Sequence, residues 1–409
     1  MELLSPASLE EAADCVRSAI ADKAPLEILG ASSKRGFGRP VEAAKQLTTA
    51  AMSGIVSYHP EELVLVARAG THMDEIAAAL QEKNQHLAFE PPDFGKLYPG
   101  DDAGRNRTGT LGGILATNLS GPRRFKAGAA RDHFLGFTAV NGRGEVFKGG
   151  GPVVKNVTGY DLPKLLAGSF GTLAVMDEVT IKVLPRPEKT RTVLLYGLDA
   201  TAANAAMTKA LTGPYDISAA AFLPEIQAQA SDCDYVGAQG SVTALRVEGS
   251  GPVVEHHCAA LRRDFANDLG GATEELHSTN SMTLWREIGD LSIFFDIDTI
   301  LWRISVPPAH GAGVAASCAI DIPGSSFLLD WGGGLIWLSI PSDGGAHADK
   351  VRRAFQRCGG HATLVRAPEV ERRKVQVFEA EGAKALTEQV KLSFDPERVL
   401  NPGRMFEGV

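Results

Sequence analysis

Two glycine-rich segments contain the residue types best suited to hold a phosphorylated cofactor. The first, GASSKRGFG, covers residues 30–38 and follows the apolar run PLEIL. The second, TGTLGGILATNLSG, covers residues 108–121. Small residues leave backbone N–H groups accessible, and successive N–H groups can surround a pyrophosphate. We therefore expect the first segment to contact phosphates, although an ordinary surface turn has the same composition.

The familiar nucleotide-binding and hydrolase motifs do not occur in this sequence. The first segment lacks the G-x-G-x-x-G order of a Rossmann site, and no clear amphipathic helix begins at its end. There is no P-loop motif and no G-x-S-x-G nucleophile elbow. The two glycine-rich segments suit an extended dinucleotide instead, with its pyrophosphate at the first segment and its ring system at the second.

Helices and strands alternate around these two segments. Ser8 and Glu11 form a capping box ahead of an amphipathic helix that ends near Lys23. PLEIL, at 25–29, is then expected to form a short strand that leads into the first glycine-rich segment. The apolar run at 62–70 predicts a buried strand, followed by a second helix. This alternation predicts an α+β domain.

The rest of the chain predicts a second domain. Asn141-Gly142 indicates a hairpin, and residues 172–184 form a strongly apolar strand pattern. PRPEKT, at 185–190, combines two prolines with charges and is the best candidate for a domain boundary. Beyond it, helix and strand patterns mix, including a helix pattern at 201–211 and a strand pattern at 333–340.

Composition excludes several classes of function. The chain has 409 residues and a formal charge of −8, which argues against nucleic-acid binding. Its five cysteines are widely spaced without a C-x-x-C motif, so we expect no disulfide framework, structural zinc or iron–sulfur cluster. No apolar run is long enough to span a membrane, and the first ten residues do not look like a secretory signal. A cytoplasmic protein is expected.

Four segments together resemble the FAD-binding domain of the vanillyl-alcohol oxidase family, also described as the p-cresol methylhydroxylase (PCMH) type. They are GTLGGILATNLSG, AARDHFLGFTAVNGRGEV, KNVTGYDLPKLLAGSFGTLAVMDEVTIKVLP and FDPERVLNPGRMF. The resemblance implies a PCMH-type, two-subdomain FAD-binding domain over residues 1–187. It also implies an α+β cap domain over 191–375, for substrate or subunit binding, and a C-terminal segment, 376–409, that returns to the FAD domain.

The resemblance assigns cofactor contacts to particular residues. It places a pyrophosphate loop at Gly30, Ala31, Ser32, Ser33 and Lys34. Flavin and ribityl contacts are placed at Gly112, Gly113, Thr117, Asn118, Ser120 and Gly121. Adenine-side contacts fall at Leu173 and Val175, with the TGYD residues at 158–161 close by, and Asn401 is similar to the residue that returns to the isoalloxazine edge.

The resemblance also bears on how the flavin is attached. Part of the family bonds its flavin to a His in the first loop or to a later Cys. Residues 30–39 contain neither residue type, so we expect non-covalent FAD. Lys34 and Arg35 are expected to neutralise the pyrophosphate instead.

Within the family, the chain is most similar to the FAD-binding subunits of bacterial glycolate oxidase, also called glycolate dehydrogenase. The resemblance implies oxidation of glycolate to glyoxylate in a heteromeric complex that contains a second flavoprotein subunit and an iron–sulfur subunit. Electrons would pass to the iron–sulfur partner, and partner subunits would supply any membrane association. Two alternatives stay open: a self-sufficient FAD-dependent dehydrogenase of a 2-hydroxy acid or sugar alcohol, and a structural subunit that FAD stabilises.

No catalytic residue and no metal site can be assigned from the sequence. His256 and His257 lie in a helical pattern, whereas His310 and His361 lie in loops without a nearby carboxylate. DWGGGLIWL, at 330–338, stands where the sister subunit of the complex has a histidine-rich metal and substrate motif, so independent catalysis is doubtful. The four tryptophans are expected to lie in the core or at an interface. They are Trp285, Trp302, Trp331 and Trp337.

Overall fold

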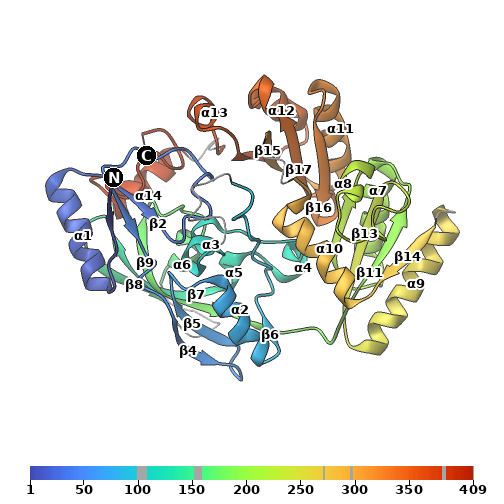
Figure 1. Cartoon of the computed structure of the whole chain (residues 1–409), viewed down its shortest axis with the longest axis horizontal. Coiled ribbons are helices and arrows are strands. Elements are labelled where there is room, and N and C mark those ends of the chain that lie inside the picture. Colours follow the sequence, from blue (N-terminus) through green and yellow to red (C-terminus); the bar gives the residue numbers. More distant parts are fainter. Residues whose placement is uncertain (99–107, 152–158, 270–271, 295–297, 380–383, 409) are drawn as a thin grey trace. The chain divides into compact units, whose positions relative to one another are not determined.

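The computed structural model describes residues 1–98, 108–151, 159–269, 272–294, 298–379 and 384–408 (Figure 1). The chain divides into two compact units. The first contains residues 1–120, 128–186 and 372–409, and the second contains residues 121–127 and 187–371. The proline-rich connector therefore lies at the main division. The short segment 121–127 was expected in the first domain, but it packs with the second unit.

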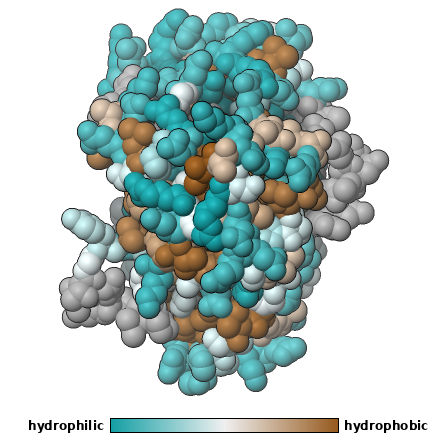
Figure 2. Space-filling view, turned by 90° about the vertical axis from the view of Figure 1, so that its left-hand side faces the viewer, coloured by the Kyte–Doolittle hydropathy of each residue, from teal (hydrophilic) through white to brown (hydrophobic). Residues whose placement is uncertain are grey.

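The first unit begins with a small parallel sheet covered by one helix. The strand order is β1, β3, β2, with bounds Glu2–Leu4, Lys45–Thr48 and Leu26–Leu29. Helix α1 (Leu9–Asp22) begins at Ser8, whose hydroxyl accepts a hydrogen bond from the Glu11 N–H. The helix buries its alanine and valine side chains in the core. The exposed residues of α1 are mostly polar. Figure 2 shows the left-hand side of the view in Figure 1, and this face is mainly hydrophilic with small apolar areas.

A five-stranded antiparallel sheet forms the second part of this unit. The strand order is β4, β5, β9, β7, β8, with bounds Ile55–His59, Val64–Arg68, Ala174–Lys182, Phe134–Asn141 and Val146–Gly150. A separate pair joins β6 (Gln85–His86) to β10 (Leu184–Pro185). The helices of this part are α2 (Met73–Glu82), α3 (Leu111–Thr117), α5 (Ala130–His133) and α6 (Leu162–Leu166). The predicted hairpin is present as β7 and β8.

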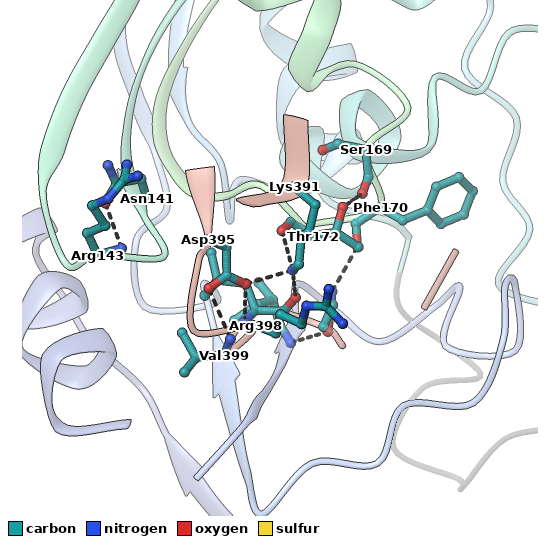
Figure 3. A network of polar contacts seen from close by, with 12 residues as sticks. Asn141, Arg143, Ser169, Phe170, Thr172, Lys391, Asp395, Arg398 and Val399 are labelled. Atoms are coloured by element: carbon teal, nitrogen blue, oxygen red, sulfur yellow. Dashed lines mark hydrogen bonds and ion pairs between the residues drawn. The ribbon is translucent and has the colours of Figure 1, made fainter. Parts of the chain in front are cut away.

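The C-terminal segment returns to the first unit, beside β2. Helix α14 (Lys384–Phe394) is followed by a turn that puts Leu400 in a parallel bridge with Leu26. Lys391 holds this turn: its ammonium donates to the Thr172 and Leu400 carbonyls, each at 2.7 Å (Figure 3). Burial lowers the pKa of Lys391, while the adjacent Asp395 carboxylate opposes that shift. The segment is therefore an integral part of this unit's core.

The second unit is built on one eight-stranded antiparallel sheet. The strand order is β14, β11, β13, β12, β16, β17, β15, β18. In that order the bounds are Thr273–Leu276, Lys189–Tyr196, Val242–Gly249, Ile217–Leu223, Ser326–Asp330, Leu335–Pro341, Thr299–Ser305 and His361–Arg366. Trp285, Trp302 and Trp337 are buried here, as expected, whereas Trp331 is only half-buried.

Helices cover this sheet and fill its connections. The longer ones are α7 (Ala200–Thr212), α9 (Gly251–Leu269), α10 (Ser278–Asp290), α11 (Gly311–Asp321) and α12 (Ala348–Phe355). The shorter ones are α4 (Arg124–Ala127), α8 (Glu225–Gln229) and α13 (Glu369–Lys374), of which α13 spans the division at residue 372. Within the described residues, no helix combines the length and the apolar character needed to cross a bilayer.

Candidate functional site

A pocket in the first unit brings together segments that are far apart in the chain. It holds about 760 Å³ of empty space, a volume that includes solvent at its open mouth. Its wall contains the whole of segment 27–35, much of the stretch from Thr110 to Thr117, and parts of the stretch from Phe170 to Met176. Asn401 and Arg404 of the C-terminal segment complete it. Both glycine-rich segments therefore face the same cavity.

Gly30 allows the first loop to touch the start of α3. A Cβ atom at Gly30 would lie 2.3 Å from the Thr110 hydroxyl oxygen, which is far too close for any larger residue. Two residues later, Ser32 adopts a left-handed backbone with a φ of 61°. The loop leaves β2, turns sharply at Ser32 and remains in the wall of the pocket. Its small residues follow from this close approach.

Arg404 holds the far side of this loop. Its guanidinium donates to the carbonyls of Arg35 at 3.0 Å, Arg39 at 3.1 Å and Lys34 at 3.3 Å. Burial lowers the pKa of Arg404 to about 10, so the side chain is still charged at neutral pH. The C-terminal segment thus fixes the backbone of the loop. The sequence gives only a weak signal for this role, a basic residue just after the Asn401-Pro402-Gly403 turn.

Lys34 is a cation in the pocket wall that forms no ion pair with any residue the structure describes. Its ammonium donates to the Ser33 hydroxyl at 3.2 Å and makes no ion pair with the described residues. Burial lowers its pKa to about 8, and the field of Asp93 partly opposes the shift. Arg35 differs, because its guanidinium binds both oxygens of Glu27, at 2.8 and 2.7 Å. Of the two cations expected at the phosphates, Lys34 is the one free to meet an anion.

Helix α3 packs so closely on the sheet that it needs glycine. A Cβ atom at Gly112 would lie 2.8 Å from the Cβ of Ala69. The helix begins at Thr110, whose hydroxyl accepts from the Gly113 N–H, and Thr117 donates its hydroxyl to the Gly113 carbonyl at 2.7 Å. Both hydroxyls are therefore engaged within the helix, while Gly112, Gly113 and Thr117 still line the pocket.

Asn401 joins three parts of the wall. Its side-chain oxygen accepts from the Ile28 N–H, and its amide nitrogen donates to the Phe170 carbonyl, both at 2.8 Å. Phe170 and Gly171 both have left-handed backbones, with φ of 54° and 70°. The amide of Asn401 thus fixes β2 and the turn before β9 at the edge of the pocket.

The predicted site residues divide into two groups. Those in the pocket wall are Gly30, Ala31, Ser32, Ser33, Lys34, Gly112, Gly113, Thr117 and Asn401. The remaining ones lie outside it. Asn118 ends α3 and accepts from the Arg131 N–H, and Ser120 accepts from the Ala130 N–H. Gly121 belongs to the second unit, where its carbonyl accepts from the Trp331 indole N–H.

The adenine-side residues are buried in strand β9 or its approach. Leu173 and Val175 do not line the pocket, whereas their neighbours Ala174 and Met176 do. Alternate residues of a strand point to opposite faces, so a difference of one position decides which side chains reach the cavity. Of the nearby TGYD residues, Thr158 lies outside the described residues and Tyr160 is 89% exposed.

Several wall residues were not found from the sequence. Among them, Ala116, Ala174 and Met176 give the pocket apolar surface, and Phe170 contributes an aromatic ring. The signal for Ala116 was its place one turn after Gly112 on the same helix. The others lie in segments that the sequence analysis interpreted only as a strand or a turn.

The candidate catalytic histidines do not lie in this pocket. His256 and His257 are neighbours on α9, with ring centroids 5.7 Å apart. His310 and His361 are exposed residues of the second unit. Across the described part of the chain, no group of three or more His, Cys, Asp or Glu side chains is arranged to hold a metal ion. The structure therefore assigns none of the four histidines a chemical role.

The sequence matches a family model and known glycolate oxidase subunits. Residues 2–150 match a family model described as "FAD binding domain". The chain is 34% identical over 394 residues to glycolate oxidase subunit GlcE of Escherichia coli strain K12, covering 96% of this chain and 95% of that protein. It is 26% identical to glycolate oxidase subunit GlcD of Bacillus subtilis strain 168, covering 90% and 80%.

Two solved structures share the fold. A 4-ethylphenol oxidase from Gulosibacter chungangensis aligns with a TM-score of 0.74 at 14% identity, covering 99% of this chain and 89% of that one. A p-cresol methylhydroxylase aligns with a TM-score of 0.73 at 14% identity, covering 99% and 88%. These likenesses confirm the predicted α+β fold of PCMH type.

Proposed function

Since this chain belongs to the family of the FAD-linked glycolate oxidase subunit GlcE, we propose that it binds FAD without a covalent bond in the pocket of its first unit. Its role is that of the FAD-binding subunit of a glycolate dehydrogenase. The observation that carries this proposal is the meeting of two glycine-rich segments and Asn401 around one cavity. The alternatives are weighed below against the same observation.

The residues of the pocket fit an FAD molecule. Segment 30–34 offers small side chains and backbone N–H groups for a pyrophosphate, with the unpaired ammonium of Lys34 beside them. Ala116, Ala174 and Met176 offer an apolar surface for a flat ring system. A charge-assisted contact from Lys34 is worth roughly 1.5–3 kcal/mol. We assign the phosphates to the first surface and the isoalloxazine to the second.

The composition of the wall supports non-covalent attachment. Among the described residues that line the pocket there is no His, Cys or Tyr side chain. Such side chains supply the nucleophile that a covalent bond to flavin requires. Lys34 occupies the first loop instead, and its contribution to binding is electrostatic. Adenine-side contacts remain proposed near Leu173 and Val175, through backbone rather than side chains.

In the assembled complex, FAD bound here would supply a two-electron acceptor for the oxidation of a 2-hydroxy acid, in which a hydride leaves the carbon that bears the hydroxyl group. The alcohol also loses its hydroxyl proton, so glycolate becomes glyoxylate with the loss of two electrons and two hydrogens. Among this chain's residues, Asn401 and Arg404 hold the loops that orient the cofactor. Lys34 compensates charge at the phosphates.

The electrons must then leave the chain. Its five cysteines are widely spaced and form no cluster-binding motif, so a second redox centre has no ligands here. We propose that an iron–sulfur subunit accepts the electrons and that a second flavoprotein subunit completes the complex. The relatives named glycolate oxidase subunits support a multi-subunit enzyme. A cytoplasmic location, with membrane contact only through partners, fits this arrangement.

One experiment separates this proposal from its alternatives. Glycolate is added without oxygen to the purified FAD-loaded chain, alone and together with its partner subunits, and flavin absorbance is followed. We expect no bleaching alone and reduction of this chain's flavin during turnover of the complex. Rapid bleaching alone would instead indicate a self-sufficient dehydrogenase. A flavin that stays oxidised while the complex turns over would indicate a structural subunit.

A further inference from the structure

Arg303 is a half-buried cation that has no anionic partner among the residues that the structure describes. It lies in the middle of β15, opposite Trp337 of β17 and Thr363 of β18. Among the described residues its side chain makes no hydrogen bond and no ion pair, and its guanidinium lies over the ring of Trp331. Burying a charge without a partner costs free energy, so such a group calls for an explanation.

A second guanidinium lies against the same ring. The central carbon of Arg124 is 4.8 Å from the centroid of Trp331, and that of Arg303 is 5.0 Å from it. Burial lowers the pKa of Arg303 to about 10, and the positive charge of Arg124 contributes to the shift while Asp330 opposes it. Arg303 therefore remains charged at neutral pH. Two cations therefore converge on one aromatic side chain within the second unit.

Arg123 and Arg246 of the same unit differ from Arg303, because a carboxylate neutralises them. Arg123 binds both oxygens of Glu248, at 2.6 and 2.9 Å. Arg246 lies 3.7 Å from the same carboxylate and donates to the Ser218 hydroxyl at 3.1 Å. Burial opposes ionisation of Glu248, yet the two arginines lower its pKa to about 2. The fold thus supplies a carboxylate to Arg123 and Arg246, whereas no carboxylate of the described residues lies within ion-pair distance of Arg303.

Trp331 is held in an unusual backbone conformation. Three successive residues, Trp331, Gly332 and Gly333, have left-handed φ values of 52°, 65° and 95°. The Asp330 carboxylate accepts from the Trp331 N–H at 2.7 Å, and the Trp331 indole donates to the Gly121 carbonyl at 3.2 Å. A left-handed conformation at a bulky residue costs about 1–3 kcal/mol, and such strain is typical of functional positions. The turn fixes an aromatic wall beside the two cations.

We propose that Arg303 and Arg124, with Trp331 as the wall beside them, bind the carboxylate of a small organic acid. A planar guanidinium pairs with a carboxylate through two parallel hydrogen bonds, and two guanidinium groups favour a compact anion. The identity of the acid, a 2-hydroxy acid such as glycolate, rests on the proposed function. The binding site itself rests only on residues of the second unit. This chain would then hold substrate as well as cofactor.

The test measures glycolate binding to the full-length, FAD-loaded chain by calorimetry, at constant ionic strength and without turnover. We expect saturable binding that Arg303→Met weakens ~10- to 100-fold, because a charge-assisted pair is lost. Arg303→Lys keeps the positive charge but loses the planar guanidinium with its two parallel N–H donors. It should therefore weaken glycolate binding by a smaller factor. Arg357→Gln, at an exposed arginine, serves as the matched control and should leave binding unchanged.

Three results would overturn the inference. They are the absence of glycolate binding, equal binding by wild type and both Arg303 variants, and equally tight binding of inorganic phosphate. Flavin content and circular dichroism are recorded on the same samples, and if Arg303→Met does not fold, Arg303→Lys decides the question. Because the FAD pocket uses other residues, both variants should keep their flavin. A wild-type chain that binds glycolate but no FAD would contradict the proposed function alone.

Discussion

Lys391 donates a hydrogen bond to Asp395 at 2.6 Å in the core of the first unit, where the two residues are 1% and 0% exposed. The Lys391 ammonium also donates to the Thr172 and Leu400 carbonyls. Asp395 accepts from the Val399 and Leu400 N–H groups, as Figure 3 shows. The pair therefore fixes the turn that brings Asn401 and Arg404 to the wall of the proposed FAD pocket. A buried ion pair here determines the shape of a site that it does not touch.

Removing the cation of this pair should loosen the turn. Lys391→Met leaves a buried carboxylate without its partner, which costs about 3–5 kcal/mol. We expect a lower free energy of unfolding in urea and a lower flavin content after gel filtration. Lys384→Met, at an exposed position of the same helix, is the control. If the two variants retain flavin and stability equally, the turn does not depend on the pair.

The affinity for FAD should depend on pH through Lys34. Its pKa of about 8 in the free protein lies below the ordinary lysine value of 10.5, so the charged form needed for phosphate binding is lost as pH rises through 8. Binding must then restore a proton, and the Kd should rise by up to ~10-fold between pH 8 and pH 9. Fluorescence titration of the apoprotein measures this.

Lys34→Met tests the origin of that dependence. It should bind FAD more weakly at pH 7, and its Kd should lose the additional increase above pH 8. In the wild-type apoprotein, the pKa of Lys34 is lower in the folded than in the unfolded chain, so the unfolded chain holds more protons between pH 8 and 10.5. The free energy of unfolding of the wild-type apoprotein should therefore increase with pH over this range. An identical pH dependence in wild type and variant would refute the assignment of Lys34 to the phosphates.

A single methyl group at Gly30 should disturb the pocket. In Gly30→Ala the new Cβ meets the Thr110 hydroxyl, which also caps α3. Displacing it should lower the free energy of unfolding by about 1–3 kcal/mol and reduce flavin retention. Gly313→Ala provides a matched control, because that glycine lies in a helix with open space around it. Equal behaviour of the two variants would show that the close approach at Gly30 is not needed.

The Glu248 carboxylate should stabilise the second unit in a pH-dependent way. Its pKa of about 2 lies below the ordinary glutamate value of 4.5, so its contribution to stability is complete above pH 4.5 and is lost as pH falls towards 2. The shift corresponds to roughly 3 kcal/mol. Glu248→Gln should therefore remove that part of the acid dependence in urea unfolding, while Glu225→Gln, at an exposed position of the same unit, should not. Parallel curves for wild type and Glu248→Gln would contradict this.

Local sequence patterns predicted much of the first unit. The helix expected to end near Lys23 is observed as Leu9–Asp22, and the strand expected at 25–29 is observed as Leu26–Leu29. These succeed because capping residues and apolar periodicity act within a few residues. The glycine-rich segments were recognised for the same reason, since their small residues reflect a close approach that any such pocket requires.

Other features depend on contacts between distant residues and could not be read locally. Segment 121–127 packs with the second unit because Arg123 finds Glu248, far along the chain. The role of Arg404 depends on three carbonyls of the first loop. The single-position difference between Val175 and Met176 depends on how β9 is oriented in its sheet, which strand propensity does not reveal.

The most direct measurement is the absorption spectrum of the purified chain before and after acid precipitation. If two glycine-rich segments and Asn401 enclose a freely exchanging FAD, the protein is yellow and all of its flavin appears in the supernatant. A colourless protein that takes up no added FAD would contradict the pocket assignment. Flavin that remains with the precipitated polypeptide would contradict non-covalent attachment.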